Sequence, residues 1–120
     1  MAKVLFQNPE LQDYLFKNDL DNSETSTANA GALAVDKCTS LISSAGAESR
    51  TLAAPSALGV GGVQLKIIRM SVKVGNVTLA GTNVLGQGAA TATFAAVGDS
   101  LVLMNNGSKW VEIGGNVVWA

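Results

Sequence analysis

The chain has 120 residues, of which 48% are hydrophobic, 5% aromatic and 14% charged, and its formal net charge is −1 at neutral pH. This length fits one domain with a core poor in large side chains, and oligomerisation is a common way to stabilise such a core. The absence of histidine and of a basic surplus argues against a zinc site, a Ser-His-Asp triad and a nucleic-acid binder.

Residues 1–32 are predicted to form an N-terminal arm and a linker. Asn8, Pro9 and Glu10 together form a signal for the start of a short helix. The polar segment NSETSTANAGA, residues 22–32, has no periodicity and predicts the linker. Apolar side chains are concentrated in the arm, and these form the candidate capsid-binding set named below: Val4, Leu5, Phe6, Leu11, Tyr14, Leu15 and Phe16.

Charge is distributed unevenly between this first third of the chain and the rest. Acidic residues are frequent before residue 37, whereas Arg50, Lys66, Arg69 and Lys73 follow one another with no acidic residue between Arg50 and Asp99. The acidic arm and the more basic remainder are therefore expected to meet partners of opposite sign.

Residues 33–120 are predicted to form an all-β domain, an antiparallel β-sandwich or a barrel-like fold. Turn signals recur about every 8–12 residues, which is typical of these folds. The strands are expected at residues 33–36, 39–44, 49–55, 63–74, 77–81, 91–97 and 100–104. Gly75-Asn76 predicts a hairpin turn, and a change of hydrophobic phase between Ile67 and Ile68 predicts a bulge or a strand between two packed layers.

The closing stretch, residues 98–120, is predicted to form a three-stranded meander. Turns at Asn106-Gly107 and Gly114-Gly115 would pair Leu103 with Trp110 and Trp110 with Trp119. One face then carries Leu101, Leu103, Trp110, Val117 and Trp119, and the other carries Val102, Met104, Val111, Ile113 and Val118. Because both faces are apolar, the second needs a cover such as another subunit, and Trp110 and Trp119 are candidates for that subunit interface or for the core.

Chemistry-bearing motifs are sparse. Cys38 is the single cysteine, which excludes an internal disulfide and suits a reducing cytosol, and it is expected to be a small buried hydrophobe. The GVGG segment, residues 59–62, lacks the pattern of a phosphate loop, and residues 19–24 lack the spacing of a calcium loop. We therefore expect no enzyme activity, no cofactor and no metal. We also expect no signal peptide and no membrane span, because no apolar run approaches about 18 residues.

Three segments resemble the β-rich domains of tailed-bacteriophage virion proteins. These are AGAESRTLAAPSALGVGGVQLKI, GNVTLAG and TATFAAVGDSLVLMNNGSKWVEIGG, which lie within residues 45–115. The family includes capsid decoration (cement) proteins, head fibres and tail-fibre tips. The resemblance implies a homotrimer without catalytic activity, and a chain this short is more similar to a decoration protein than to a fibre with a shaft.

The function implied by this resemblance is structural. A trimer would bind the outer surface of the assembled capsid, bridge neighbouring copies of the major capsid protein and assemble in the host cytoplasm. The alternative is a receptor-binding or fibre-tip module that recognises a host glycan through Trp110, Trp119 or the loop TNVLGQGAA. The arm has two possible destinations, the capsid or a face of its own β-domain, and the length of the linker favours the capsid.

Overall fold

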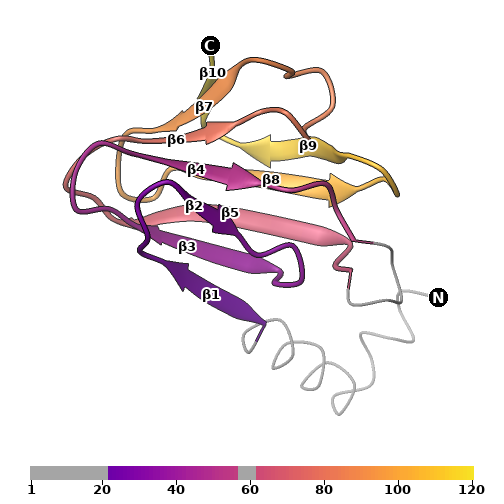
Figure 1. Cartoon of the computed structure of the whole chain (residues 1–120), viewed down its shortest axis with the longest axis horizontal. Coiled ribbons are helices and arrows are strands. Elements are labelled where there is room, and N and C mark those ends of the chain that lie inside the picture. Colours follow the sequence, from indigo (N-terminus) through magenta and orange to yellow (C-terminus); the bar gives the residue numbers. More distant parts are fainter. Residues whose placement is uncertain (1–21, 57–61) are drawn as a thin grey trace.

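The computed structural model describes residues 22–56 and 62–120, and these residues form two stacked β-sheets of five strands each (Figure 1). One sheet, called sheet A, has the order β1-β3-β5-β8-β9, and sheet B has the order β10-β7-β6-β4-β2. The strands are β1 (Ser23–Ser26), β2 (Gly31–Leu33), β3 (Thr39–Ser43), β4 (Glu48–Leu52), β5 (Leu65–Val72), β6 (Val77–Ala80), β7 (Thr91–Phe94), β8 (Ser100–Asn105), β9 (Trp110–Gly115) and β10 (Val118–Trp119). The all-β prediction is confirmed in its coarse form.

The first six strands form a coil that passes alternately through the two sheets. The odd-numbered strands β1, β3 and β5 pair in parallel in sheet A, and β2, β4 and β6 pair in parallel in sheet B. A parallel pair needs a crossover between its strands, and here each crossover is a strand of the opposite sheet. The prediction of an antiparallel sandwich is therefore wrong for this half of the domain, because both sheets are mixed.

The last four strands complete the sheets with antiparallel pairs. Strand β7 pairs with β6 and β10 in sheet B, and β8 pairs with β5 and β9 in sheet A. The C-terminus consequently lies at the β10 edge of the sandwich, away from β1 (Figure 1).

The core lies between the two sheets and is apolar in the half around β5 to β9. Its fully buried members include two large aromatic residues, Phe94 and Trp110, and the indole nitrogen of Trp110 donates to the carbonyl oxygen of Ala53 at 2.9 Å. Aliphatic side chains fill the remaining space: Ile42, Ile68, Met70, Val77, Leu79, Leu101 and Leu103. Burial of this set supplies the main driving force for folding.

Two predictions about β5 are wrong. Its burial alternates without a slip between Ile67 and Ile68, because Lys66 occupies a core-facing position and shares the phase of Ile68. The segment Gly75-Asn76 is a corner that carries the chain from sheet A to sheet B, so it does not form a hairpin.

The predicted linker is also part of the sandwich. Strand β1 lies within residues 22–32 and β2 begins there at Gly31, and they form the outermost strands of the two sheets beside β3 and β4. The β-domain therefore begins by Ser23 and not at residue 33. The predicted helix and the apolar set of residues 4–16 lie outside the described residues.

The closing stretch has the predicted faces in β8 and β9, but its pairing differs, and Val118 lies on the outer face of sheet B and not beside Met104. The turn at Asn106-Gly107 is present as a four-residue loop, because the Asn106 side chain accepts from the amides of Ser108 and Lys109, so Trp110 pairs with Asn105 rather than Leu103. Strand β10 does not pair with β9: it crosses to sheet B and pairs with β7. Gly115, whose φ is +107°, lies at this crossing.

We predict that the stacked corners at Gly46 and Gly75 respond differently to an added methyl group. A Cβ on Gly75 would overlap the backbone of Gly46 and Ala47, whereas one on Gly46 would meet no atom within 4 Å. Gly75→Ala should lower the free energy of unfolding by about 1–3 kcal/mol. The matched control Gly46→Ala should change it by less than about 0.5 kcal/mol. Urea denaturation measures both values, and equal effects would contradict the observed corner packing.

Candidate interaction surface

The outer face of sheet A carries a continuous apolar surface. Two rows of paired residues cross the sheet, one running Ile67-Val102 and the next running Leu65-Met104-Val111. Ile113 stands beside them at the bulge in β9, and Leu41 extends the surface onto β3. We call this set the apolar face: Leu41, Leu65, Ile67, Val102, Met104, Val111 and Ile113.

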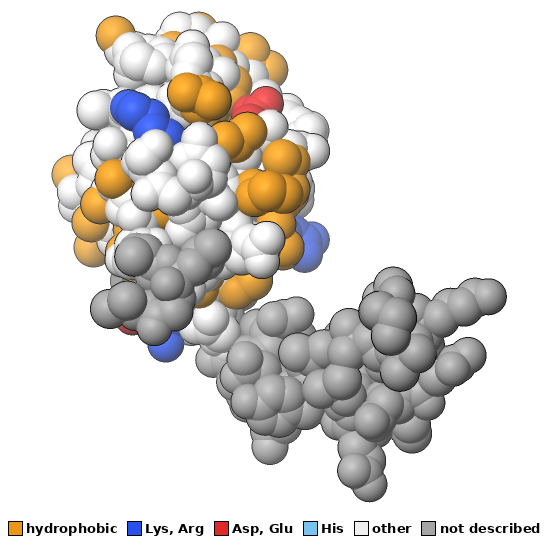
Figure 2. Space-filling view, turned by 90° about the vertical axis from the view of Figure 1, so that its right-hand side faces the viewer, with side chains coloured by type: hydrophobic (Ala, Val, Ile, Leu, Met, Phe, Trp, Pro, Cys, Tyr) orange, Lys and Arg blue, Asp and Glu red, His pale blue; other side chains and the backbone are white. Residues whose placement is uncertain are grey.

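The apolar face is accessible in the single chain. Leu65, Met104 and Ile113 are 37%, 40% and 51% exposed, although each lies beside other apolar side chains. In Figure 2, hydrophobic side chains gather in a patch along one side of the β-domain. A contiguous exposed apolar surface of this kind is typical of an interaction site.

One cation stands among these apolar side chains. Arg69 is exposed, pairs with Leu41 on one side and Ser100 on the other, and forms no ion pair with the described residues. The outward-facing positions of the five strands of sheet A hold no aspartate or glutamate in the described part of the chain. The surface is therefore apolar and basic, and its chemistry fits a partner that is apolar and acidic.

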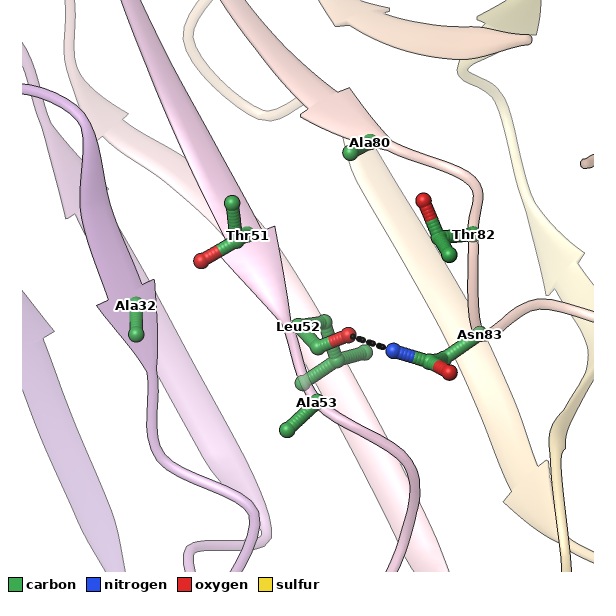
Figure 3. A pocket seen from close by; sticks show the side chains of 7 residues that line it. All are labelled: Ala32, Thr51, Leu52, Ala53, Ala80, Thr82 and Asn83. Carbon is green, nitrogen blue, oxygen red and sulfur yellow. Dashed lines mark hydrogen bonds between the residues drawn. The ribbon is translucent and has the colours of Figure 1, made fainter. Parts of the chain in front are cut away.

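The outer face of sheet B has a different character. Threonine and alanine side chains dominate it, and a shallow groove of about 260 Å³ crosses it. Its lining residues are Ala32, Thr51, Leu52, Ala53, Ala80, Thr82 and Asn83 (Figure 3). The Asn83 amide nitrogen donates to the carbonyl oxygen of Leu52 at 2.9 Å and closes one side of the groove. No charged side chain lines this groove, so it offers no acid-base chemistry.

Lys66 is the second unusual feature, because its ammonium group is buried inside the sandwich. Its Nζ donates to the carbonyl oxygens of Ala34 and Lys37 at 2.6 and 2.9 Å and to the Ser40 hydroxyl at 2.5 Å. Glu24 Oε1 lies 3.9 Å from Nζ and accepts from the Ser40 hydroxyl and the Ala34 amide. The lysine therefore joins β1, the corner between β2 and β3, and β3 itself.

Burial lowers the pKa of Lys66 from its ordinary value of 10.5 to about 8. Glu24, Cys38 and Asp36 act in the opposite direction, because negative charge near the ammonium favours the protonated form. The Lys66 side chain is fully buried and its ammonium group has three acceptors, so we interpret it as a structural group.

Arg50 is a second buried cation and lies on β4, in sheet B. Its Nε donates to the Ser26 hydroxyl at 2.9 Å, and its Nη2 lies 2.9 Å from Glu48 Oε1. The Ala45 amide and Arg50 together lower the pKa of Glu48. Arg50 therefore connects β4 of sheet B to β1 of sheet A, across the interior of the coil formed by β1 to β6.

The structure separates the residues that the sequence analysis singled out. Trp110 is fully buried in the core, so it is not available for a subunit interface. Trp119 is partly buried against the core and its indole nitrogen donates to Glu112 at 2.6 Å. Cys38 is partly buried in the corner that contains the Lys66 acceptors. The arm residues are not described.

Sequence reasoning missed Leu65 and Ile67 as surface residues and Lys66 as a core residue. The signal was present in the alternation of β5, but Lys66 was counted with Arg50 among the charges expected to meet outside partners, and both are buried. Met104, Val111 and Ile113 were correctly assigned to one face of the closing strands.

Other kinds of site have no support in the described residues. They contain no cluster of three or more histidine, cysteine, aspartate or glutamate side chains that could hold a metal ion. Nor do they contain a helix long and apolar enough to cross a membrane. The candidate site is therefore the apolar face.

Comparison with known proteins gives no family assignment: no family model matches the chain, and no curated protein matches it.

We predict that stability depends on pH through Lys66. Between pH 8 and 10.5 the unfolded chain holds the Lys66 proton and the folded chain has lost it, so the free energy of unfolding rises with pH. The gain attributable to this group is at most about 3 kcal/mol. Chemical denaturation at pH 7.5, 9 and 10 should show that the free energy of unfolding of the native protein rises with pH. The free energy of unfolding of Lys66→Met should not show this rise. A parallel pH dependence in both proteins would show that Lys66 does not titrate in this way.

Proposed function

We propose that this chain is a structural virion protein that binds the outer surface of a bacteriophage capsid and stabilises it. As a homotrimer, it would bridge neighbouring copies of the major capsid protein. The observation that carries the proposal is the apolar face, an accessible apolar surface that includes the exposed cation Arg69 at its margin. The resemblance of residues 45–115 to phage decoration and head-fibre domains supports the same function.

The internal hydrogen bonding of the domain suits this role. Every buried side-chain nitrogen or oxygen in the described residues has a hydrogen-bond partner. The two buried cations connect strands of the coil formed by β1 to β6. A protein that binds the assembled lattice more tightly than its free subunits stabilises the lattice by mass action. The arm residues Val4 to Phe16 are proposed as a second point of attachment, and three such attachments on one trimer would add avidity.

The alternative of a glycan-binding fibre tip has less support. Sugars are commonly held by exposed aromatic side chains, but Trp110 is buried and the indole nitrogen of Trp119 is already hydrogen-bonded to Glu112. The groove on sheet B is lined by small side chains without an aromatic ring. The apolar face is also better suited to protein than to carbohydrate.

We predict that a charge on the apolar face weakens capsid binding. Ile113→Asp places a carboxylate at a position that is 51% exposed, and the dissociation constant for purified shells should rise at least tenfold. The matched control Val118→Asp lies on the outer face of sheet B, is 70% exposed, and should bind like the native protein. Co-sedimentation with shells measures both. Unchanged binding by Ile113→Asp would remove the apolar face from the footprint.

We also predict that the protein sediments as a trimer at micromolar concentration. A small core poor in large side chains favours association, because association buries more surface without a longer chain. Sedimentation equilibrium measures the mass directly. A single monomeric species under these conditions would contradict the trimer.

A further inference from the structure

The apolar face requires a cover in the free protein. Leu65, Met104 and Ile113 lie on one open sheet surface, and the described residues place nothing over them. A flat apolar sheet surface left in water favours aggregation. The chain also contains a second group of apolar residues, within residues 4–16, whose exposure to water would be equally unfavourable.

The topology places the start of the described chain beside this face. Strand β1 is parallel to β3 and β5, and the row through Ser23 runs across the sheet by Thr39 and Ile67 to Val102. The row Leu65-Met104-Val111 lies next to it, at the end of the sheet where β1 begins. Residues 1–21 therefore join the domain at the edge of the apolar face.

The connection is long enough to reach. Two strand spacings separate β1 from β5, which is about 10 Å, and four separate it from β9, which is about 19 Å. The six residues 17–22 span about 20 Å when extended. Residues 4–16 can consequently lie over β5, β8 and β9 without strain in the connection.

The charges of the two partners are complementary. Residues 1–21 contain Glu10, Asp13, Asp19 and Asp21 against Lys3 and Lys17. Arg69 lies at the margin of the apolar face, between Leu41 and Ser100, and has no carboxylate partner among the described residues and no acidic neighbour on the outer face of sheet A. An acidic apolar segment is thus matched to a basic apolar surface.

We infer that residues 4–16 dock on the apolar face of their own subunit in the free protein. The short connection gives this contact a high effective concentration, and that favours the subunit's own face over a neighbour's. Docking covers both apolar groups at once. If the proposed function is right, binding to the shell exchanges this internal contact for contacts with the capsid, but the inference concerns the free protein and does not depend on that function.

Hydrogen exchange of the full-length protein tests the docking. Amides of residues 4–16 should be protected in the native protein, and Met104→Asp should increase their exchange rate at least tenfold. Val118→Asp, on the opposite sheet, should leave the rate unchanged. Amides of β3 and β5 report the fold and should stay protected in both variants. Exchange of residues 4–16 at the rate of a free peptide in the native protein, or no effect of Met104→Asp, would overturn the inference.

A charge variant tests the complementarity. Arg69→Glu should also increase the exchange rate of residues 4–16, and Arg69→Lys should preserve the native rate because the charge is kept. Both variants change an exposed side chain, so the amides of β5 should not respond. Equal rates in Arg69→Glu and Arg69→Lys would contradict the charge match.

Disulfide trapping distinguishes the subunit's own face from a neighbour's. In a Cys38→Ala background, Phe16→Cys with Met104→Cys should form a disulfide at the mass of one chain, at least fivefold faster than Phe16→Cys with Val118→Cys. Disulfides mainly between chains, or equal rates for the two pairs, would overturn docking on the same subunit. Because no shell is present in these measurements, their failure leaves the proposed function to be decided by shell binding.

Discussion

The buried ammonium group of Lys66 is the constraint on which the rest of the sandwich depends. A charge inside the core is costly unless its donors and its charge are compensated, and here two carbonyl oxygens, a hydroxyl and a carboxylate supply that compensation. The acceptors come from three separate parts of the chain, so only one register of β1 and β3 against β5 provides them. Because side chains alternate along a strand, a Lys66 that faces inward also forces Leu65 and Ile67 outward. The apolar face is therefore a consequence of the same lysine.

The interior of the sandwich changes in character along the sheets. Around β7, β8 and β9 it is filled by Phe94, Leu103 and Trp110, whereas the interior beside β1 also holds the buried cations Arg50 and Lys66 with their polar partners. Hydrogen bonds to charged groups depend strongly on geometry, and apolar packing is less directional. The position of β1 is thus specified mainly by polar contacts, and that of the later strands mainly by burial. Local opening is accordingly expected to begin at β1 and β2.

Sequence patterns predicted strand positions and faces better than they predicted strand partners. The faces of the closing strands, with Leu103 and Trp110 inward and Met104 outward, follow from alternation alone. Their partners depend on whether a glycine turn returns the chain to the same sheet or sends it to the other, and Gly75-Asn76 and Gly115 do the latter. Part of the candidate surface was predicted, because its β8 and β9 members were assigned to one face. Its β5 members were not predicted, because Lys66 was expected to face water.

The coil formed by β1 to β6 repeats itself, and this has a consequence for how such a domain can grow. Residues paired between the first and second turns are 16 apart from Ser23 to Thr39 and 19 apart from Gly31 to Arg50, and those paired between the second and third turns are 28 apart from Thr39 to Ile67 and 29 apart from Glu48 to Val77. Strands β1 and β2 form the outer edges of sheets A and B, on the same side of the sandwich. One more segment of similar length would add a strand to each sheet and lengthen the sandwich by about 5 Å, with the later strands unchanged. The length of this sandwich can therefore change by whole turns of the coil, and the turns themselves need not be equally long.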